Sequence, residues 1–218
     1  MLETNIREQI ISLIHHQVVP AVGCTEPMAV ALCVARAAEL LGSKPEKVRV
    51  LLSANILKNA MGVGIPGTGM IGLPIAIALG ALIGKSEYQL EVIKELTPKG
   101  LEEGKKFIGE NRIDIKLKER ITEKLYIEAI CEVGEHHSVA IISCSHTNFV
   151  YECVDGKVCM DKRGPSSSVA ACKGVDLNLR TVWEFATTTP VEEIEFILEA
   201  KRYNLRAAAE ALKGNYGH

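Results

Sequence analysis

The hydrophobic and polar positions of the chain fall into three blocks. In the first block, residues 1–85, apolar residues recur at helical spacing over 5–18 and 26–41. An uncharged apolar run over 70–83 predicts a helix that is buried on all sides. A short apolar stretch at 48–53 lies between the helical segments.

Residues 86–176 have a different pattern. A helix is predicted after the Thr-Pro pair at 97–98, and it is followed by segments rich in Val, Ile and Tyr with period-two alternation, which predict strands. These predicted strands are 113–117, 125–133, 138–154 and 157–160. Asp155-Gly156 is a strong signal for a two-residue hairpin turn between the last two strands.

The predicted hairpin also bears on two cysteines. It pairs Cys153 with Val158 and Cys159 with Glu152, so that the two thiols lie on opposite faces of the sheet. We therefore expect Cys153 and Cys159 to form neither a disulfide nor a shared metal site.

The last block, 177–218, returns to helical spacing. Thr189 and Glu192 fit a capping box at the start of a long helix. The three blocks, 1–85, 86–176 and 177–218, predict an α+β fold: a helical domain interrupted by a small inserted α/β module, which has an antiparallel sheet plus a helix.

Composition narrows the function classes. Among 218 residues, 25 Lys and Arg against 27 Asp and Glu give a net charge of −2, and aromatic residues are 5%. Neither the basic surface nor the stacking platform of a nucleic-acid binder is expected. Glycines and two prolines interrupt the uncharged stretch 59–84, so a buried helix is favoured over a membrane span. The seven cysteines are odd in number and show no C-x-x-C spacing, which predicts reduced thiols in a cytoplasmic protein.

The first candidate for chemistry is the segment Val22–Pro27. Thr25 can begin a helix, and Cys24 then lies at the helix N-terminus, where the helix dipole favours thiolate over thiol. Thr25 and Glu26 supply hydrogen-bonding and acid–base groups beside it. Cys24, Thr25 and Glu26 are therefore candidate catalytic residues, with a small buried cysteine as the alternative.

A second candidate is the polar face of the segment 53–60. Asn55, Lys58 and Asn59 are spaced i, i+3 and i+4, so that on a helix they share one face. A lysine with two amides could hold the carboxylate of an amino acid. The alternative is a polar stripe that faces water.

A glycine-rich run and a polar triplet complete the candidates. Residues 62–67 match G-x-G-x-x-G, but no strand directly precedes them and no acidic residue follows at the required spacing, so dinucleotide binding is not predicted. Backbone amides around Gly67 and Thr68 are expected to receive a substrate carboxylate instead. The triplet His146, Thr147 and Asn148 is expected within a strand as a substrate contact, or else as a polar cluster at the end of a strand.

These motifs, in this order, resemble the iron–sulfur L-cysteine desulfidase family, which is related to the iron–sulfur L-serine dehydratases. The resemblance implies a lyase with a [4Fe-4S] cluster whose open iron binds the leaving group of L-cysteine, and β-elimination then yields pyruvate, ammonia and sulfide. It implies that Cys24 is the base or an exchangeable ligand. It also implies that Asn55, Lys58, Asn59 and the triplet at 146–148 contact the substrate.

The family's cluster cysteines belong to a C-terminal half that lies beyond residue 218. The resemblance therefore implies an N-terminal half, truncated and inactive alone, with no metal ligands and no bound cluster of its own. We expect a small amino acid as the substrate, a companion C-terminal chain as a partner, and self-association of the chain. We expect neither nucleic acid nor a membrane as a partner. The alternatives are a fragment of an L-serine dehydratase-like lyase and a non-catalytic module that binds an amino acid.

Overall fold

The computed structural model describes residues 2–163 and 177–214. The chain divides into two compact units. We call Ala21–Cys172 the central unit, and Met1–Pro20 together with Lys173–His218 the terminal unit. The predicted α+β class is confirmed, since helices accompany a mixed six-stranded sheet and a small two-stranded sheet.

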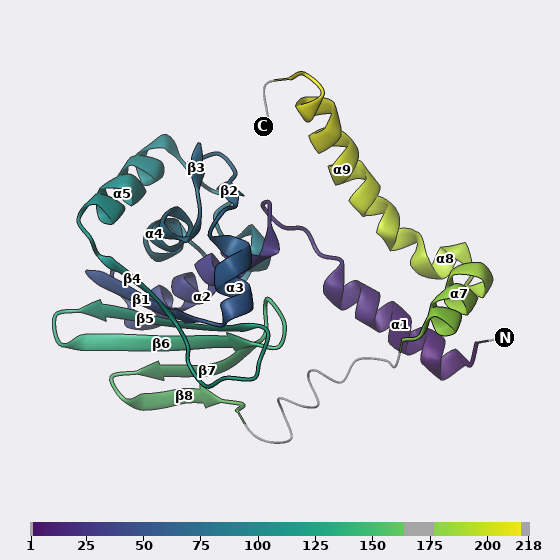
Figure 1. The fold of residues 1–218 in the computed structure, drawn as a ribbon, viewed down its shortest axis with the longest axis horizontal. Helices are drawn as coiled ribbons and strands as arrows, with labels where there is room; N and C mark the ends of the chain where they lie inside the picture. The colour runs from purple at the N-terminus through teal and green to yellow at the C-terminus, as the bar shows by residue number, and fades with distance from the viewer. Residues whose placement is uncertain (1, 164–176, 215–218) are drawn as a thin grey trace. The chain divides into compact units, whose positions relative to one another are not determined.

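The central unit is built on the six-stranded sheet, whose order is β4-β1-β5-β6-β7-β8 (Figure 1). The strands are β1 (Lys47–Leu52), β4 (Ile113–Leu117), β5 (Tyr126–Val133), β6 (His136–Ser143), β7 (Phe149–Val154) and β8 (Lys157–Asp161). β1 pairs with β4 in parallel, and the other neighbours are antiparallel. On β5, alternate residues are buried, which is the pattern of a sheet with one face on the core.

Three helices cover that face in successive layers. α2 (Thr25–Leu41) packs on β5 and β6, α4 (Leu73–Ile83) packs on α2, and α5 (Pro98–Gly109) packs on α4. Because α2 and α4 have neighbours on opposite sides, both are apolar nearly all round. The predicted buried helix is thus α4, and no helix among the described residues is long and apolar enough to cross a membrane.

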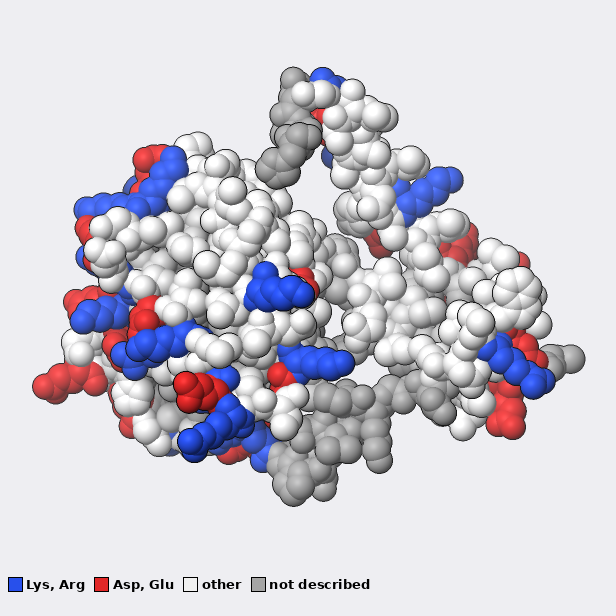
Figure 2. Space-filling model, in the orientation of Figure 1, with Lys and Arg blue, Asp and Glu red and all other residues white. Residues whose placement is uncertain are grey.

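Shorter elements connect these layers in the central unit. They are α3 (Ala54–Ala60), the hairpin strands β2 (Gly64–Ile65) and β3 (Met70–Ile71), and the 3-10 turn η1 (Ser86–Glu91). β1, from the predicted first block 1–85, lies between β4 and β5 of the second block. The predicted boundary at residue 176 lies outside the described residues. Figure 2 shows positive and negative side chains interspersed over this unit.

The register of the last hairpin is partly as predicted. Cys153 lies opposite Val158, and both Cys153 and Cys159 are free thiols. The predicted pairing of Glu152 with Cys159 is wrong: Glu152 lies opposite Met160, because the register shifts between Glu152 and Cys153.

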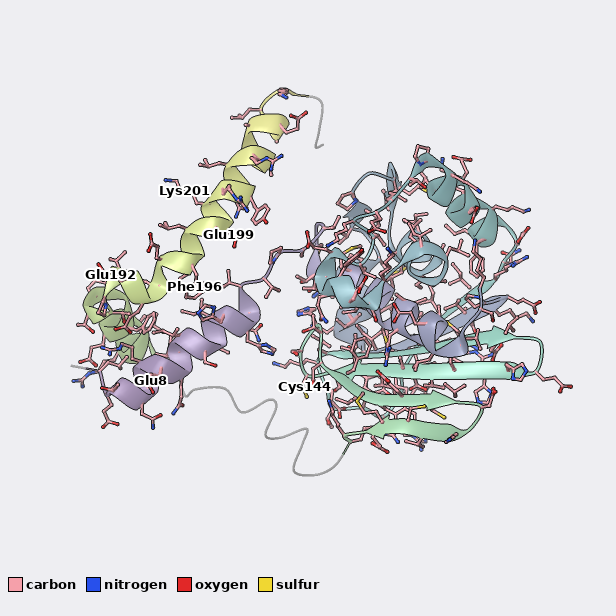
Figure 3. The ribbon with its side chains drawn as sticks, turned by 180° about the vertical axis from the view of Figure 1, so that it is seen from behind. Glu8, Cys144, Glu192, Phe196, Glu199 and Lys201 are labelled. Atoms are coloured by element: carbon pink, nitrogen blue, oxygen red, sulfur yellow. The ribbon has the colours of Figure 1, made fainter. Side chains whose placement is uncertain are left out.

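The described residues of the terminal unit form helices. They are α1 (Thr4–Gln17), α7 (Leu179–Thr188), α8 (Val191–Ile194), the 3-10 turn η2 (Glu195–Ile197) and α9 (Leu198–Ala211). Phe196, labelled in Figure 3, stacks on the ring of His15 with centroids 3.6 Å apart. The predicted capping box is wrong, because Thr189 ends α7 by donating its N–H to Phe185 and Pro190 precedes α8.

Candidate functional site

The position of Cys24 is set by the loop that enters α2. Gly23 has φ +83°, a conformation that favours glycine, and a Cβ there would lie 2.8 Å from Cγ of Pro66. The N–H of Val22 donates to the carbonyl of Leu90 at 3.2 Å. The loop is therefore fixed on one side by the β2–β3 hairpin and on the other by η1. Cys24 is the N-cap residue of α2, and its side chain is exposed.

The centre of the site is the carboxylate of Glu26, in the first turn of α2. The thiol of Cys24 donates to Oε2 of Glu26 at 3.1 Å, and the hydroxyl of Thr25 donates to the same oxygen at 3.1 Å. The amide of Asn59, on α3, donates to Oε1 at 3.3 Å. Two segments separated by 33 positions thus hold one carboxylate in a fixed orientation.

These contacts set the protonation states of the cluster. Burial and the hydrogen bond to Glu26 raise the pKa of Cys24 above its ordinary value. The hydrogen bond from the Cys24 thiol lowers the pKa of Glu26. The resting pair is therefore a thiol and a carboxylate. The expected thiolate at the helix N-terminus is wrong, because burial and the hydrogen bond to the Glu26 carboxylate both favour the thiol.

α3 carries the predicted polar face but uses its members differently. Only Asn59 turns to Glu26, while Asn55 and Lys58 are exposed. The start of α3 is fixed by Ser53, which sequence reasoning did not single out. Its buried hydroxyl donates to the carbonyl of Lys124 at 2.8 Å. A serine directly before a short helix was the available signal, although here its hydroxyl bonds across the fold and makes no side-chain cap.

The glycine-rich run forms the β2–β3 hairpin and not a nucleotide loop. Gly67 has φ +75° in its turn, where glycine is favoured. The hydroxyl of Thr68 donates to the carbonyl of Ile65 at 2.6 Å and accepts from the N–H of Met70 at 2.9 Å. Thr68 is 5% exposed, so its hydroxyl is occupied within the hairpin. The N–H of Thr68 donates to the carbonyl of Ile65 at 3.2 Å and is therefore occupied, while the expected ligand contact at Gly67 stays a prediction.

The triplet at 146–148 was expected within a strand. It lies instead in a turn between β6 and β7. The amide of Asn148 donates to the carbonyl of Ser143 at 2.9 Å and closes this turn. Cys144, labelled in Figure 3, begins the turn with φ +71°. Thr147 is half-buried in the same turn.

His146 is the member of the triplet that interacts electrostatically with Glu26. The side chain is half-buried, and burial lowers the pKa of its imidazole, while the negative charge of Glu26 acts in the opposite direction. The structure thus brings together Cys24, Thr25, Glu26 and Asn59, with His146 in electrostatic reach. Among the described residues, no group of three or more His, Cys, Asp or Glu side chains could hold a metal ion.

Comparison with known proteins finds relatives that are named UPF0597 proteins. The chain is 64% identical over 212 residues to a UPF0597 protein of Phocaeicola vulgatus. It is 61% identical over 218 residues to one of Bacteroides thetaiotaomicron, and 42% identical over 210 residues to one of Aeromonas hydrophila. The alignments cover 97%, 100% and 95% of this chain, but 49%, 51% and 47% of the relatives. The chain thus spans about half the length of the curated relatives it matches. No family model and no solved structure matches.

These relatives correct the expected resemblance. The similar proteins that align with nearly the whole chain are named UPF0597 proteins, and their names contain no desulfidase, dehydratase or iron–sulfur function. The assignment to the iron–sulfur L-cysteine desulfidase family is therefore wrong, and so is the description of the chain as a truncated N-terminal half of such a lyase. The same names give no support to an iron–sulfur lyase activity.

Proposed function

We propose that the Glu26 cluster is a cysteine-dependent catalytic site that acts on a small amino-acid ligand. The observation that carries this proposal is the 3.1 Å hydrogen bond from the exposed Cys24 thiol to Oε2 of Glu26. A nucleophile within hydrogen-bond reach of a base, with the base oriented by a further group, is the arrangement that activates a weak nucleophile. The further groups here are Thr25 and Asn59.

The direction of the pKa shifts defines how this pair would act. Since the pKa of Cys24 is raised, the thiol keeps its proton at neutral pH. Glu26, whose pKa is lowered, is ionised and accepts the hydrogen bond of the thiol, so that Oε2 would receive the proton of Sγ while the sulfur takes a proton from the ligand. In this cycle the ligand regains a proton from sulfur, and the proton on Oε2 then returns to Sγ.

An amino acid suits the surroundings of the thiol. The first turn of α2 has no side-chain cap, so its N–H groups and the positive end of the helix dipole favour an anionic group. Lys58 adds a positive charge on the neighbouring helix α3, and Asn55 adds an exposed amide. A ligand carboxylate placed there would leave its amine toward Glu26 and His146. The ligand carboxylate would then lie near the positive charge of Lys58, and the ligand amine near the negative charge of Glu26.

The test is ligand protection of Cys24 against alkylation. The full chain is treated with iodoacetamide in the presence of each of a panel of amino acids, and labelled peptides are quantified by mass spectrometry. Exposed Cys159 serves as the reference thiol in the same molecule. We expect at least one amino acid to slow labelling of Cys24 and leave Cys159 unchanged. Lys58→Gln should weaken this protection, and Lys105→Gln, on exposed surface of α5, should not.

A second measurement examines the pair itself. In Glu26→Gln the carboxylate charge is removed, so the pKa of Cys24 should fall and alkylation should reach half its maximal rate at a lower pH than in the wild type. If no amino acid at millimolar concentration protects Cys24, the ligand class is wrong. If the pH profile of Cys24 is the same with and without the carboxylate, Glu26 is not its base.

A further inference from the structure

A second site lies in the central unit, on residues that the Glu26 cluster does not use. An open pocket of about 720 Å³ is found where β7 and β8 meet α2 and η1. Its lining includes Arg36 and Glu39 from α2, Glu87 from η1, and Phe149 and Met160 from the sheet.

The polar wall of this pocket is held in place by ion pairs. Arg36 donates from Nε and Nη2 to the two carboxylate oxygens of Glu152, each at 2.8 Å, and Glu152 is 7% exposed. The carboxylate of Glu39 accepts the N–H of Ser86 at 2.7 Å and also its hydroxyl. The α2 side of the pocket is therefore ordered before any ligand arrives, which reduces the entropic cost of binding.

The charge of the pocket is negative once its internal pairs are counted. The guanidinium of Arg36 is neutralised by Glu152, and the ammonium of Lys85 lies 2.7 Å from Glu95. Glu39 forms a longer ion pair with the same Arg36, with a nitrogen–oxygen distance of 3.6 Å. In the part of the chain that the structure describes, the exposed carboxylate of Glu87 has no ion-pair partner. Two carboxylates thus remain to attract a cation.

Beside Glu152, the sheet side of the pocket presents two apolar side chains. Phe149 and Met160 project from the face of β7 and β8 that carries Glu152, the face toward α2. A ring face and a thioether accept aliphatic groups, and an aromatic ring also attracts an adjacent cation. The pocket therefore combines a surface for an alkyl chain with carboxylates at its rim.

We propose that this pocket binds a small aliphatic amine, with its ammonium group between Glu39 and Glu87 and its alkyl chain on Phe149 and Met160. The amine class follows from the net negative charge of the pocket, and the aliphatic body follows from the apolar side chains of the sheet. This binding is independent of the chemistry at Cys24.

Isothermal titration calorimetry of the full chain tests the proposal with three five-carbon probes that differ in charge. Cadaverine carries two ammonium groups, pentanediol is its neutral counterpart, and glutarate is an anion. We expect saturable binding of cadaverine and none of pentanediol or glutarate at the same concentrations. Glu87→Gln should weaken cadaverine by about fivefold in Kd, the effect of one surface ion pair.

The matched control is Glu135→Gln, which removes one carboxylate from the exposed β5–β6 turn and should leave the Kd unchanged. Both residues are exposed, so both variants should fold. Equal affinity for cadaverine and pentanediol would overturn the role of charge. A Kd for Glu87→Gln equal to that for Glu135→Gln would overturn the assignment to this pocket, as would the absence of cadaverine binding.

Discussion

The packing of α4 on α2 leads to a sharp prediction for the substitution Gly80→Ala. A Cβ at Gly80 would lie 2.5 Å from the carbonyl oxygen of Ala31 and 3.0 Å from its Cα, whereas ordinary contacts begin near 3.4 Å. The neighbouring atoms belong to the backbone of a helix and cannot rotate away. The two helices would have to separate by about 0.9 Å, which weakens dispersion contacts along the interface.

The expected magnitude combines two opposing effects. Overpacking of a core costs up to about 3 kcal/mol, and replacing glycine by alanine within a helix returns about 1 kcal/mol. Gly80→Ala should therefore lower the free energy of unfolding by up to about 2 kcal/mol. Gly109→Ala, at the end of α5, meets nothing within 4 Å and should be neutral or stabilising by about 0.5 kcal/mol.

Urea denaturation followed by circular dichroism measures both variants against the wild type. The reasoning requires the midpoint of Gly80→Ala to fall and that of Gly109→Ala to stay or rise, with similar slopes. If Gly80→Ala were as stable as Gly109→Ala, the close approach of α2 and α4 would be refuted. A lower urea midpoint in both variants would show that the assumed gain in helix propensity from glycine to alanine was wrong. It would not contradict the close helix interface.

Three other expectations follow from the same structure. Glu152→Gln should lower the free energy of unfolding by about 2 kcal/mol in urea denaturation, because it leaves the partly buried guanidinium of Arg36 without its bidentate anion. Glu103→Gln breaks only the exposed pair with Lys44 and should lower the free energy of unfolding by less than about 0.5 kcal/mol. Burial lowers the pKa of His146 below 6.5, so the unfolded chain binds more protons than the folded chain just below pH 6.5. The free energy of unfolding of the wild type should therefore decrease as the pH falls through this range. His146→Asn should make the difference in stability between about pH 7.5 and about pH 5.5 smaller in denaturation experiments. Burial raises the pKa of Cys33 and raises that of Cys131 to about 12, so iodoacetamide should label both only in denaturant, and labelling of the native protein would contradict their burial.

The candidate site could be found in part from the sequence. The neighbours Cys24, Thr25 and Glu26 were named from one short segment, and the i, i+4 spacing on α3 placed Asn59 among the candidates. The protonation state of Cys24 could not be found in this way. It depends on the burial of the thiol and on whether the Glu26 carboxylate turns toward the sulfur, an orientation that the amide of Asn59, from another helix, helps to fix.

The turn at 146–148 shows a second limit. Continuous β-forming residues over 138–154 predicted one long strand, but the sheet divides it into β6 and β7. Period-two alternation reports which face a residue occupies and not where the chain reverses. The signal for the reversal was the polar cluster itself, whose Asn148 closes the turn by bonding to Ser143.

The sequence by itself determined the α+β class, the buried helix α4 and the turn at Asp155-Gly156, because each depends on the order of apolar residues and on local backbone preference. Tertiary structure alone decided the contacts between distant segments. Arg36 and Glu152 are separated by 116 positions, yet they form the pair that holds the second pocket. Charge partners and pocket walls are chosen by the packing of α2 on the sheet, and that packing sums many weak contacts that no local pattern records.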